Sequence, residues 1–371
     1  MLSVFVACRS AKTVAVKGAG AEDDSWQRFV LATGNNICVA VALWRRAILH
    51  TLNTFGVFIC VDSCFSATII FYGVEFMKNT VFQGVGTALV TPLNENGVDY
   101  EAFERLIEWQ IEEGVNALVI AGTTGEGSTL TDEEHKEVLR FSVEKVNGRV
   151  PIIAGTGSND TAYAIALTKF ACEVGCDAML LVTPYYNKAT QRGLIESFKA
   201  IADASTKPCI LYNVPSRTGC NLTPASCAIL AEHPNIVGIK EASGNISQIA
   251  EITALTKGNF DIYSGNDDQI VPLLSLGGKG VISVVSNILP KKTVEICDKF
   301  FAGDLEGSRN LQLELLPLIN SLFCEVNPIP VKAAVAAMGY GENYVRLPLT
   351  TMEPENEAKM LELMREQGLN V

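Results

Sequence analysis

The feature that most constrains the fold is a regular alternation of short apolar segments and amphipathic helical segments, which begins at residue 82. The apolar segments are continuous runs of Val, Ile, Leu and Ala, a pattern typical of strands buried on both faces of a parallel sheet. Eight strands are predicted, at residues 84–91, 117–122, 151–157, 178–184, 209–215, 236–242, 261–265 and 280–286.

Amphipathic helices are predicted between these strands, for example over 99–114 and 131–148. Thr131, followed three residues later by Glu134, has the pattern of a helix capping box. Eight strand–helix units in about 220 residues predict an α/β fold, a (β/α)₈ TIM barrel over 77–303. A small helical region is expected over 304–371. A doubly wound open sheet is the competing fold, but no G-x-G-x-x-G sequence opens a helix after the first strand.

Composition excludes several functional classes. The net charge of −12 and the pI near 4.9 argue against binding to nucleic acid or to an anionic membrane. The eleven cysteines are scattered singly and there are three histidines, so no zinc motif is predicted. Cys172 and Cys176, on a predicted helix, are interpreted as packing residues. Reduced cysteines in this pattern favour the cytoplasm.

Residues 1–76 differ from the rest of the chain and show no persistent helical or strand period. Their features fit neither a secretory signal nor a transit peptide, and Asp62 interrupts a membrane helix that could be drawn through 55–74. They hold Trp26 and Trp44, two of the three tryptophans. We expect this segment to be an extension outside the functional protein, which would begin naturally at Met77.

In a barrel of this kind the chemistry lies at the carboxyl ends of the strands. Lys240 lies within the apolar run 236–242, where a charged amine is costly. Burial lowers the pKa of an amine, and the neutral amine attacks a carbonyl to form an imine. A salt bridge to a neighbouring carboxylate such as Glu241 is the alternative interpretation, and Lys240 alone does not decide between the two.

The neighbouring strand ends supply polar groups suited to imine chemistry. Tyr212 and the pair Tyr185–Tyr186 are candidate proton shuttles. Thr123 and Thr124 add hydroxyl groups, and the glycines around them allow backbone N–H groups to approach a carboxylate. Arg217 offers a forked cation for a second carboxylate. Each residue alone has a structural explanation, but packing explains the combination poorly.

The motifs GTTGE, TPYYN, YNVPSRTG and SGND, together with the strand lysine, resemble the dihydrodipicolinate synthase family over residues 77–371. The resemblance implies a lyase of lysine and diaminopimelate biosynthesis. Such an enzyme condenses pyruvate with L-aspartate 4-semialdehyde to 4-hydroxy-tetrahydrodipicolinate. It also implies a homotetramer built as a dimer of dimers, with no dissociable cofactor and no catalytic metal.

The resemblance also implies residue roles. Lys240 would form the Schiff base, and a proton relay would consist of Thr123, Tyr212 and Tyr186, the last presented across a subunit interface. Three further residues would contact substrate: Thr124 at the pyruvate carboxylate, Arg217 at the semialdehyde carboxylate, and Ile282 through its backbone carbonyl near Lys240.

Lysine inhibits some members of this family at a dimer interface. Ser128, His135, Asn159 and Tyr185 fall at positions of that site, but Tyr163 stands where inhibited members have an acidic residue. Gly127 and Asp132 also depart from the most sensitive pattern. Because the cationic effector would lose a carboxylate partner, we expect weak or absent feedback by lysine.

Two other functions are consistent with parts of the pattern. One is a related lyase, such as N-acetylneuraminate lyase or a keto-deoxy-sugar-acid aldolase, which would share the lysine and tyrosine. Arg217 favours an aldehyde that carries a carboxylate over a neutral hydroxylated one. The other is a barrel that binds a keto acid without catalysis, in which replacement of the reactive residues would be expected.

Overall fold

The computed structural model describes residues 37–41, 55–61, 67–73, 78 and 80–371, and the chain forms two compact units, Met1–Met77 and Lys78–Val371. In the first unit three strands form an antiparallel sheet: β1 (Ile37–Val41), β2 (Phe55–Val61) and β3 (Ala67–Gly73). The sequence pattern did not predict these strands. Trp26, Trp44, Asp62 and Met77 lie outside the described residues. Within the described part of the chain, no helix is long and apolar enough to cross a bilayer.

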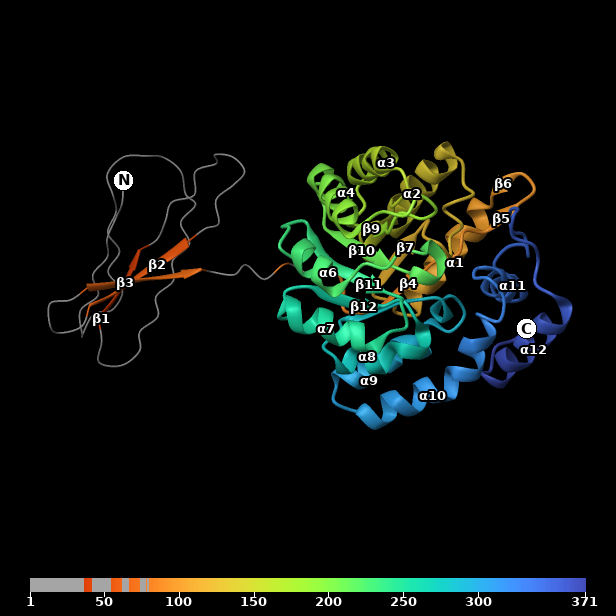
Figure 1. The fold of residues 1–371 in the computed structure, drawn as a ribbon. Helices are drawn as coiled ribbons and strands as arrows, with labels where there is room; N and C mark the ends of the chain where they lie inside the picture. The colour runs from red at the N-terminus through yellow and green to blue at the C-terminus, as the bar shows by residue number, and fades with distance from the viewer. Residues whose placement is uncertain (1–36, 42–54, 62–66, 74–77, 79) are drawn as a thin grey trace. The chain divides into compact units, whose positions relative to one another are not determined.

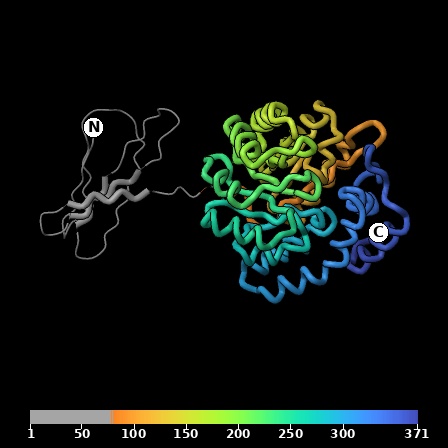
Figure 2. The backbone as a smooth tube through the Cα atoms, viewed as in Figure 1, coloured from red at the N-terminus to blue at the C-terminus, as the bar shows by residue number. Residues whose placement is uncertain are grey.

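In the second unit eight parallel strands close into a barrel, which confirms the predicted (β/α)₈ fold (Figure 1, Figure 2). Around the barrel the strands are β4 (Gly84–Ala88), β7 (Ala117–Ile120), β8 (Ile152–Gly155), β9 (Ala178–Val182), β10 (Cys209–Asn213), β11 (Ile236–Glu241), β12 (Asp261–Ser264) and β13 (Gly280–Ser283). β13 pairs with β4 to close the ring. Each strand ends one to three residues before its predicted end.

Helices connect the strands in the order expected. They are α1 (Tyr100–Glu112), α2 (Asp132–Val146), α3 (Thr161–Val174), α4 (Gln191–Ala204), α5 (Pro215–Thr218), α6 (Pro224–Ala231), α7 (Ile246–Thr256), α8 (Ile270–Ser275) and α9 (Pro290–Phe301). Short elements complete the loops: the hairpin β5 (Leu93–Asn94) and β6 (Gly97–Val98), and the 3₁₀ turns η1 (Asp267–Gln269) and η2 (Val285–Asn287). The capping box predicted at Thr131 and Glu134 opens α2.

The predicted helical region after the barrel consists of α10 (Leu305–Ser321), α11 (Ile329–Ala337) and α12 (Pro354–Glu366), which lie along one side of the barrel (Figure 1). The main apolar core lies between the strands and their covering helices. A smaller apolar cluster fills the barrel interior. At one end of this inner cluster Phe82 stacks on Tyr263, with ring centroids 4.4 Å apart, and Tyr263 donates a 2.7 Å hydrogen bond to the Phe82 carbonyl.

Candidate active site

Lys240 points into the barrel from β11. It is 5 % exposed, and its register partners on the adjacent strands are Tyr212 and Tyr263. Its Nζ atom lies 4.4 Å from the centroid of the Tyr212 ring. The amine is therefore held inside the barrel against a phenol, as an imine-forming lysine requires.

The surroundings of Lys240 make its charged form less favourable than that of an exposed lysine. Burial lowers the pKa of its amine from 10.5 to about 8, and the nearby Arg217 cation acts in the same direction. The negative charge of Asp267 opposes this shift. A lysine with this pKa carries a much larger fraction of neutral, nucleophilic amine near neutral pH than an exposed lysine does.

The alternative ion pair with Glu241 is not formed. Adjacent residues of a strand point to opposite faces, and the buried Glu241 carboxylate instead accepts hydrogen bonds from amide groups. Asn213 Nδ2 donates to both carboxylate oxygens at 3.2 and 3.0 Å, and Gln248 Nε2 donates at 3.1 Å. The backbone N–H of Ser243 adds a bond of 2.7 Å. The Glu241 carboxylate therefore links β11 to Asn213 of β10, and it forms no ion pair with the Lys240 amine.

Tyr212 ends β10 and is buried beside Lys240. Burial raises the pKa of its phenol, while the Arg217 charge and a hydrogen bond with the Thr123 side chain lower it. Thr123 follows β7 and is half-buried. The phenol is therefore protonated near neutral pH and is connected to a second hydroxyl that leads toward the barrel mouth.

Thr124, Asn327 and Arg217 form a connected group at the same mouth. Asn327 Nδ2 donates to the Thr124 hydroxyl oxygen at 3.0 Å, and the Arg217 guanidinium donates to the Asn327 carbonyl at 2.9 Å. The Thr124 oxygen accepts here, so its own proton remains available to a ligand. Arg217 is exposed, and only one of its guanidinium nitrogens is used in this contact.

Of the two remaining predicted residues, Tyr186 lies apart from the buried group and Ile282 lies within it. Tyr186, in the loop after β9, is 93 % exposed and does not meet Lys240 within one chain. Its φ of 70° is a left-handed conformation that is unusual for an aromatic residue and often marks a functional position. Ile282 is fully buried on β13 and belongs to the same inner cluster as Tyr212.

Sequence reasoning missed two buried residues at this mouth. Asn327 precedes α11, far along the chain from Thr124, and Asp267 follows β12. The Oδ1 atoms of both are enclosed without a hydrogen-bond partner. Asp267 belongs to the SGND motif, so its place after a strand was a usable signal. Asn327 offered no signal in the sequence except that it precedes a proline.

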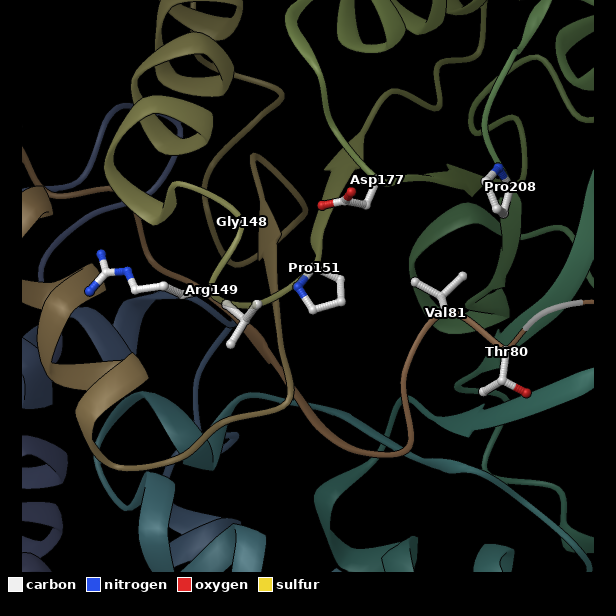
Figure 3. Close-up of a pocket in the computed structure, with 8 residues that line it drawn as sticks. Thr80, Val81, Gly148, Arg149, Pro151, Asp177 and Pro208 are labelled. Atoms are coloured by element: carbon white, nitrogen blue, oxygen red, sulfur yellow. The ribbon is translucent and has the colours of Figure 1, made fainter.

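A cavity of about 290 Å³ lies at the other end of the barrel (Figure 3). Its lining residues are Thr80, Val81, Gly148, Arg149, Val150, Pro151, Asp177 and Pro208. All of them lie in the segments that lead into β4, β8, β9 and β10, and the amino-terminal face of such barrels serves stability rather than catalysis. We therefore place the active site at the mouth that holds Lys240. Among the described residues, no group of three or more His, Cys, Asp or Glu could hold a metal ion.

Comparison with known proteins gives consistent matches over the barrel unit. The family model described as the dihydrodipicolinate synthetase family matches residues 81–367. The 4-hydroxy-tetrahydrodipicolinate synthase of Acetivibrio thermocellus is 55 % identical over 293 residues, which are 79 % of this chain and 100 % of that protein.

Two crystal structures of dihydrodipicolinate synthases are similar to the chain. The Thermotoga maritima structure has a TM-score of 0.77 and 45 % identity, covering 78 % of this chain and 100 % of that one. The Cyanidioschyzon merolae structure, which has lysine bound, has a TM-score of 0.77 and 42 % identity, covering 79 % of this chain and 100 % of that one.

Proposed function

The chain belongs to the dihydrodipicolinate synthetase family, and from this membership we propose how its own residues carry out the family's reaction. The enzyme is a lyase of lysine and diaminopimelate biosynthesis that condenses pyruvate with L-aspartate 4-semialdehyde to 4-hydroxy-tetrahydrodipicolinate. The observation that carries the assignment of residues is the buried Lys240 amine, with its pKa lowered to about 8, beside Tyr212.

In the proposed mechanism the neutral Lys240 amine attacks C2 of pyruvate, and water leaves to give a protonated imine. Loss of a proton from C3 then gives an enamine, whose C3 is the nucleophile toward the semialdehyde. Tyr212 and Thr123 transfer protons in these steps. Tyr186 of a second subunit completes the relay, which accounts for its exposure in the single chain.

Three residues bind substrate in this proposal. Thr124 donates its free hydroxyl proton to the pyruvate carboxylate, and Arg217 pairs with the carboxylate of the semialdehyde. We propose that the backbone carbonyl of Ile282, a residue of the same inner cluster as Tyr212, lies near the lysine. The exposed guanidinium of Arg217 favours the semialdehyde over the neutral sugar-derived aldehydes of related lyases.

We also propose the assembly and location of the enzyme. A requirement for Tyr186 from a second subunit supports an oligomer, and the family resemblance suggests a homotetramer built as a dimer of dimers. A cytoplasmic location is supported by the seven free cysteines of residues 80–371, because thiols remain reduced there. Pyruvate and aspartate semialdehyde are the expected small-molecule partners, and neither nucleic acid nor a membrane is expected.

Reduction with borohydride in the presence of pyruvate tests the central proposal. The wild-type enzyme should gain a stable pyruvate adduct, which peptide mass spectrometry should locate at Lys240. Lys240→Ala should lose the adduct and nearly all turnover. Lys240→Arg is the matched control, because it keeps a cation of similar length that cannot form an imine. An adduct on another residue, or activity in Lys240→Arg, would contradict the proposal.

A coupled assay separates the synthase from its relatives. Turnover with pyruvate and aspartate semialdehyde should greatly exceed turnover with sugar-acid substrates. Arg217→Ala should reduce kcat/KM for the semialdehyde much more than it reduces adduct formation with pyruvate, since the guanidinium acts on the second substrate.

A further inference from the structure

One carboxyl group at the barrel mouth has no part in the steps above. Asp267 begins η1 just after β12, and its side chain is buried. Its Oδ2 atom accepts hydrogen bonds from the backbone N–H groups of Val284 and Val285, both at 2.9 Å, and the Ser283 hydroxyl also bonds the carboxyl group. The other oxygen, Oδ1, is enclosed and has no hydrogen-bond partner. A buried bare oxygen is costly, which suggests that it interacts with a charge.

Lys240 lies directly beside the segment that carries Asp267. β11 pairs with β12, and a Cβ atom at Gly265 would be 3.1 Å from Cε of Lys240. Glycine at this position therefore leaves room for the lysine side chain. No ion pair found among the described residues includes Lys240, so Asp267 acts on the amine through its charge and not through a direct bond.

The charges of the two groups affect each other. The pKa of Asp267 is raised above its ordinary value because burial outweighs three effects that lower it: Ser283, the N–H groups of residues 284 and 285, and the Lys240 charge. Donors gathered on one oxygen favour the ionised carboxylate. Arg217 acts on Lys240 as a second cation, and Asp267 is the anion that opposes it. On the α9 side, Cys297 is a buried thiol whose pKa is raised, so it adds no charge.

We propose that Asp267 is the fixed counter-charge of the Lys240 nitrogen, balancing it first as an ammonium and then as the iminium formed with pyruvate. In that step the nitrogen bonds to C2 and the ketone oxygen leaves as water with both amine protons. The imine nitrogen then takes up one further proton. The Lys240 nitrogen thus becomes positively charged again at the same buried position, where the preorganised Asp267 carboxylate stabilises the charge. Asp267 acts through Lys240 and is a positioning residue.

This inference rests on the proposed Schiff-base function and is tested by the pH dependence of imine formation. The rate of adduct formation with pyruvate and cyanoborohydride is measured by mass spectrometry across pH. Asp267→Asn keeps an oxygen for the two N–H groups but removes the charge. It should lower the midpoint of the pH profile by about one unit, because the ammonium loses its counter-charge. The same substitution should also raise the KM for pyruvate, because the iminium loses its counter-charge as well.

Two further variants make the test specific. Asp268→Asn removes an exposed carboxylate from the next position of η1 and should leave the midpoint unchanged. Ser283→Ala removes a hydrogen bond that keeps Asp267 ionised, so it should lower the midpoint by a smaller amount. Circular dichroism confirms that each variant is folded.

The outcomes are distinct. A folded Asp267→Asn enzyme with an unchanged or raised midpoint overturns the role of Asp267 but leaves the Schiff-base function intact. If Asp267→Asn does not fold, an unchanged midpoint in Ser283→Ala overturns it instead. Absence of any adduct in the wild-type enzyme would overturn the proposed function itself.

Discussion

Lys240 combines two requirements that conflict in an exposed lysine, since it must be neutral to attack and must later carry charge as an iminium. With a pKa of about 8, adduct formation at limiting pyruvate should rise with pH and reach half its maximum near that value. The rise follows because deprotonation creates the nucleophile. Rapid-quench trapping across pH measures it. A midpoint close to the ordinary 10.5 would show that burial does not tune this amine.

Thr124 is expected to bind the substrate through a single proton. Its oxygen already accepts from Asn327, so its hydroxyl can donate to the pyruvate carboxylate. Thr124→Val keeps the shape and removes the donor, and should raise the KM for pyruvate by roughly tenfold or more, as expected for a hydrogen bond to a charged group. Thr124→Ser restores the hydroxyl and should recover most of the affinity. Equal KM values in the two variants would contradict this role.

Tyr163 occupies the position expected to bear a carboxylate in lysine-inhibited relatives. Its hydroxyl donates to Asp132 Oδ1 at 3.1 Å, and burial together with Asp132 raises its pKa to about 12, so it remains uncharged at physiological pH. We therefore predict weak or absent inhibition by lysine, measured as the concentration that halves turnover. Tyr163→Glu should strengthen inhibition. Half-inhibition of the wild-type enzyme by submillimolar lysine would refute the prediction.

At the scale of single residues, the sequence identified polar groups at or near the carboxyl ends of apolar strands. Lys240, Tyr212 and Thr124 could be proposed as site residues because packing explains their combination poorly, although each residue alone has a structural explanation. Asn327 could not, because its contact with Thr124 joins residues 203 positions apart. The hydrogen-bond partners of Glu241 also could not be predicted from the sequence. Side chains alternate between the two faces of a strand, but this alternation does not show on which face the amide donors lie.

At the scale of elements, the sequence predicted all eight strands but placed their ends too late. β13 illustrates the cause: it was expected to reach residue 286 but ends at Ser283. The N–H groups of Val284 and Val285 bind the Asp267 carboxylate instead of a neighbouring strand, and a 3₁₀ turn follows. Apolar residues continue past the last hydrogen-bonded residue of the strand because the loops at this mouth of the barrel are also buried.

The C-terminal helices are joined by a buried ion pair to the loop after β7, which carries Thr123 and Thr124. Lys332 of α11 contacts Glu126 at 2.5 Å, and the two side chains are 2 % and 1 % exposed. Glu126 has a φ of 53°, a strained value that the pair helps to maintain two residues beyond Thr124. The backbone N–H of Arg346 donates to the same carboxylate at 3.2 Å. The loop that carries Thr123 and Thr124 is thereby fixed from outside the barrel.

Lys332→Met should destabilise the enzyme by about 3–5 kcal/mol, because it leaves the Glu126 charge buried and unpaired. Urea unfolding followed by circular dichroism measures the change. Lys359→Met is the matched control: its pair with Glu355 is 66 % and 85 % exposed, so the loss should stay within about 1 kcal/mol. The double variant Glu126→Gln/Lys332→Met should recover part of the lost stability. Similar losses in the two single variants would contradict the argument.

At the scale of the whole molecule, the barrel closes without residues 1–76. The ring is completed by the pairing of β13 with β4, both in the unit Lys78–Val371, and the family match begins at residue 81. The Acetivibrio thermocellus relative is matched over its full length by 79 % of this chain. We propose that the catalytic machinery is contained in residues 77–371, with the barrel over 77–303 and the helical region over 304–371.

A chain that begins at Met77 should therefore keep its kcat and KM within about twofold, as expected for a self-contained domain. A chain that begins at Gly84 is the contrasting variant. It loses Phe82, which stacks on Tyr263, and Lys78, whose amine donates to the Ile236 carbonyl at 2.6 Å at the start of β11. Because these contacts close the amino-terminal end of the barrel, this shorter chain should unfold at a lower temperature. Steady-state kinetics and thermal unfolding compare both with the full chain. Loss of activity on removal of residues 1–76 alone would show that the extension takes part in function.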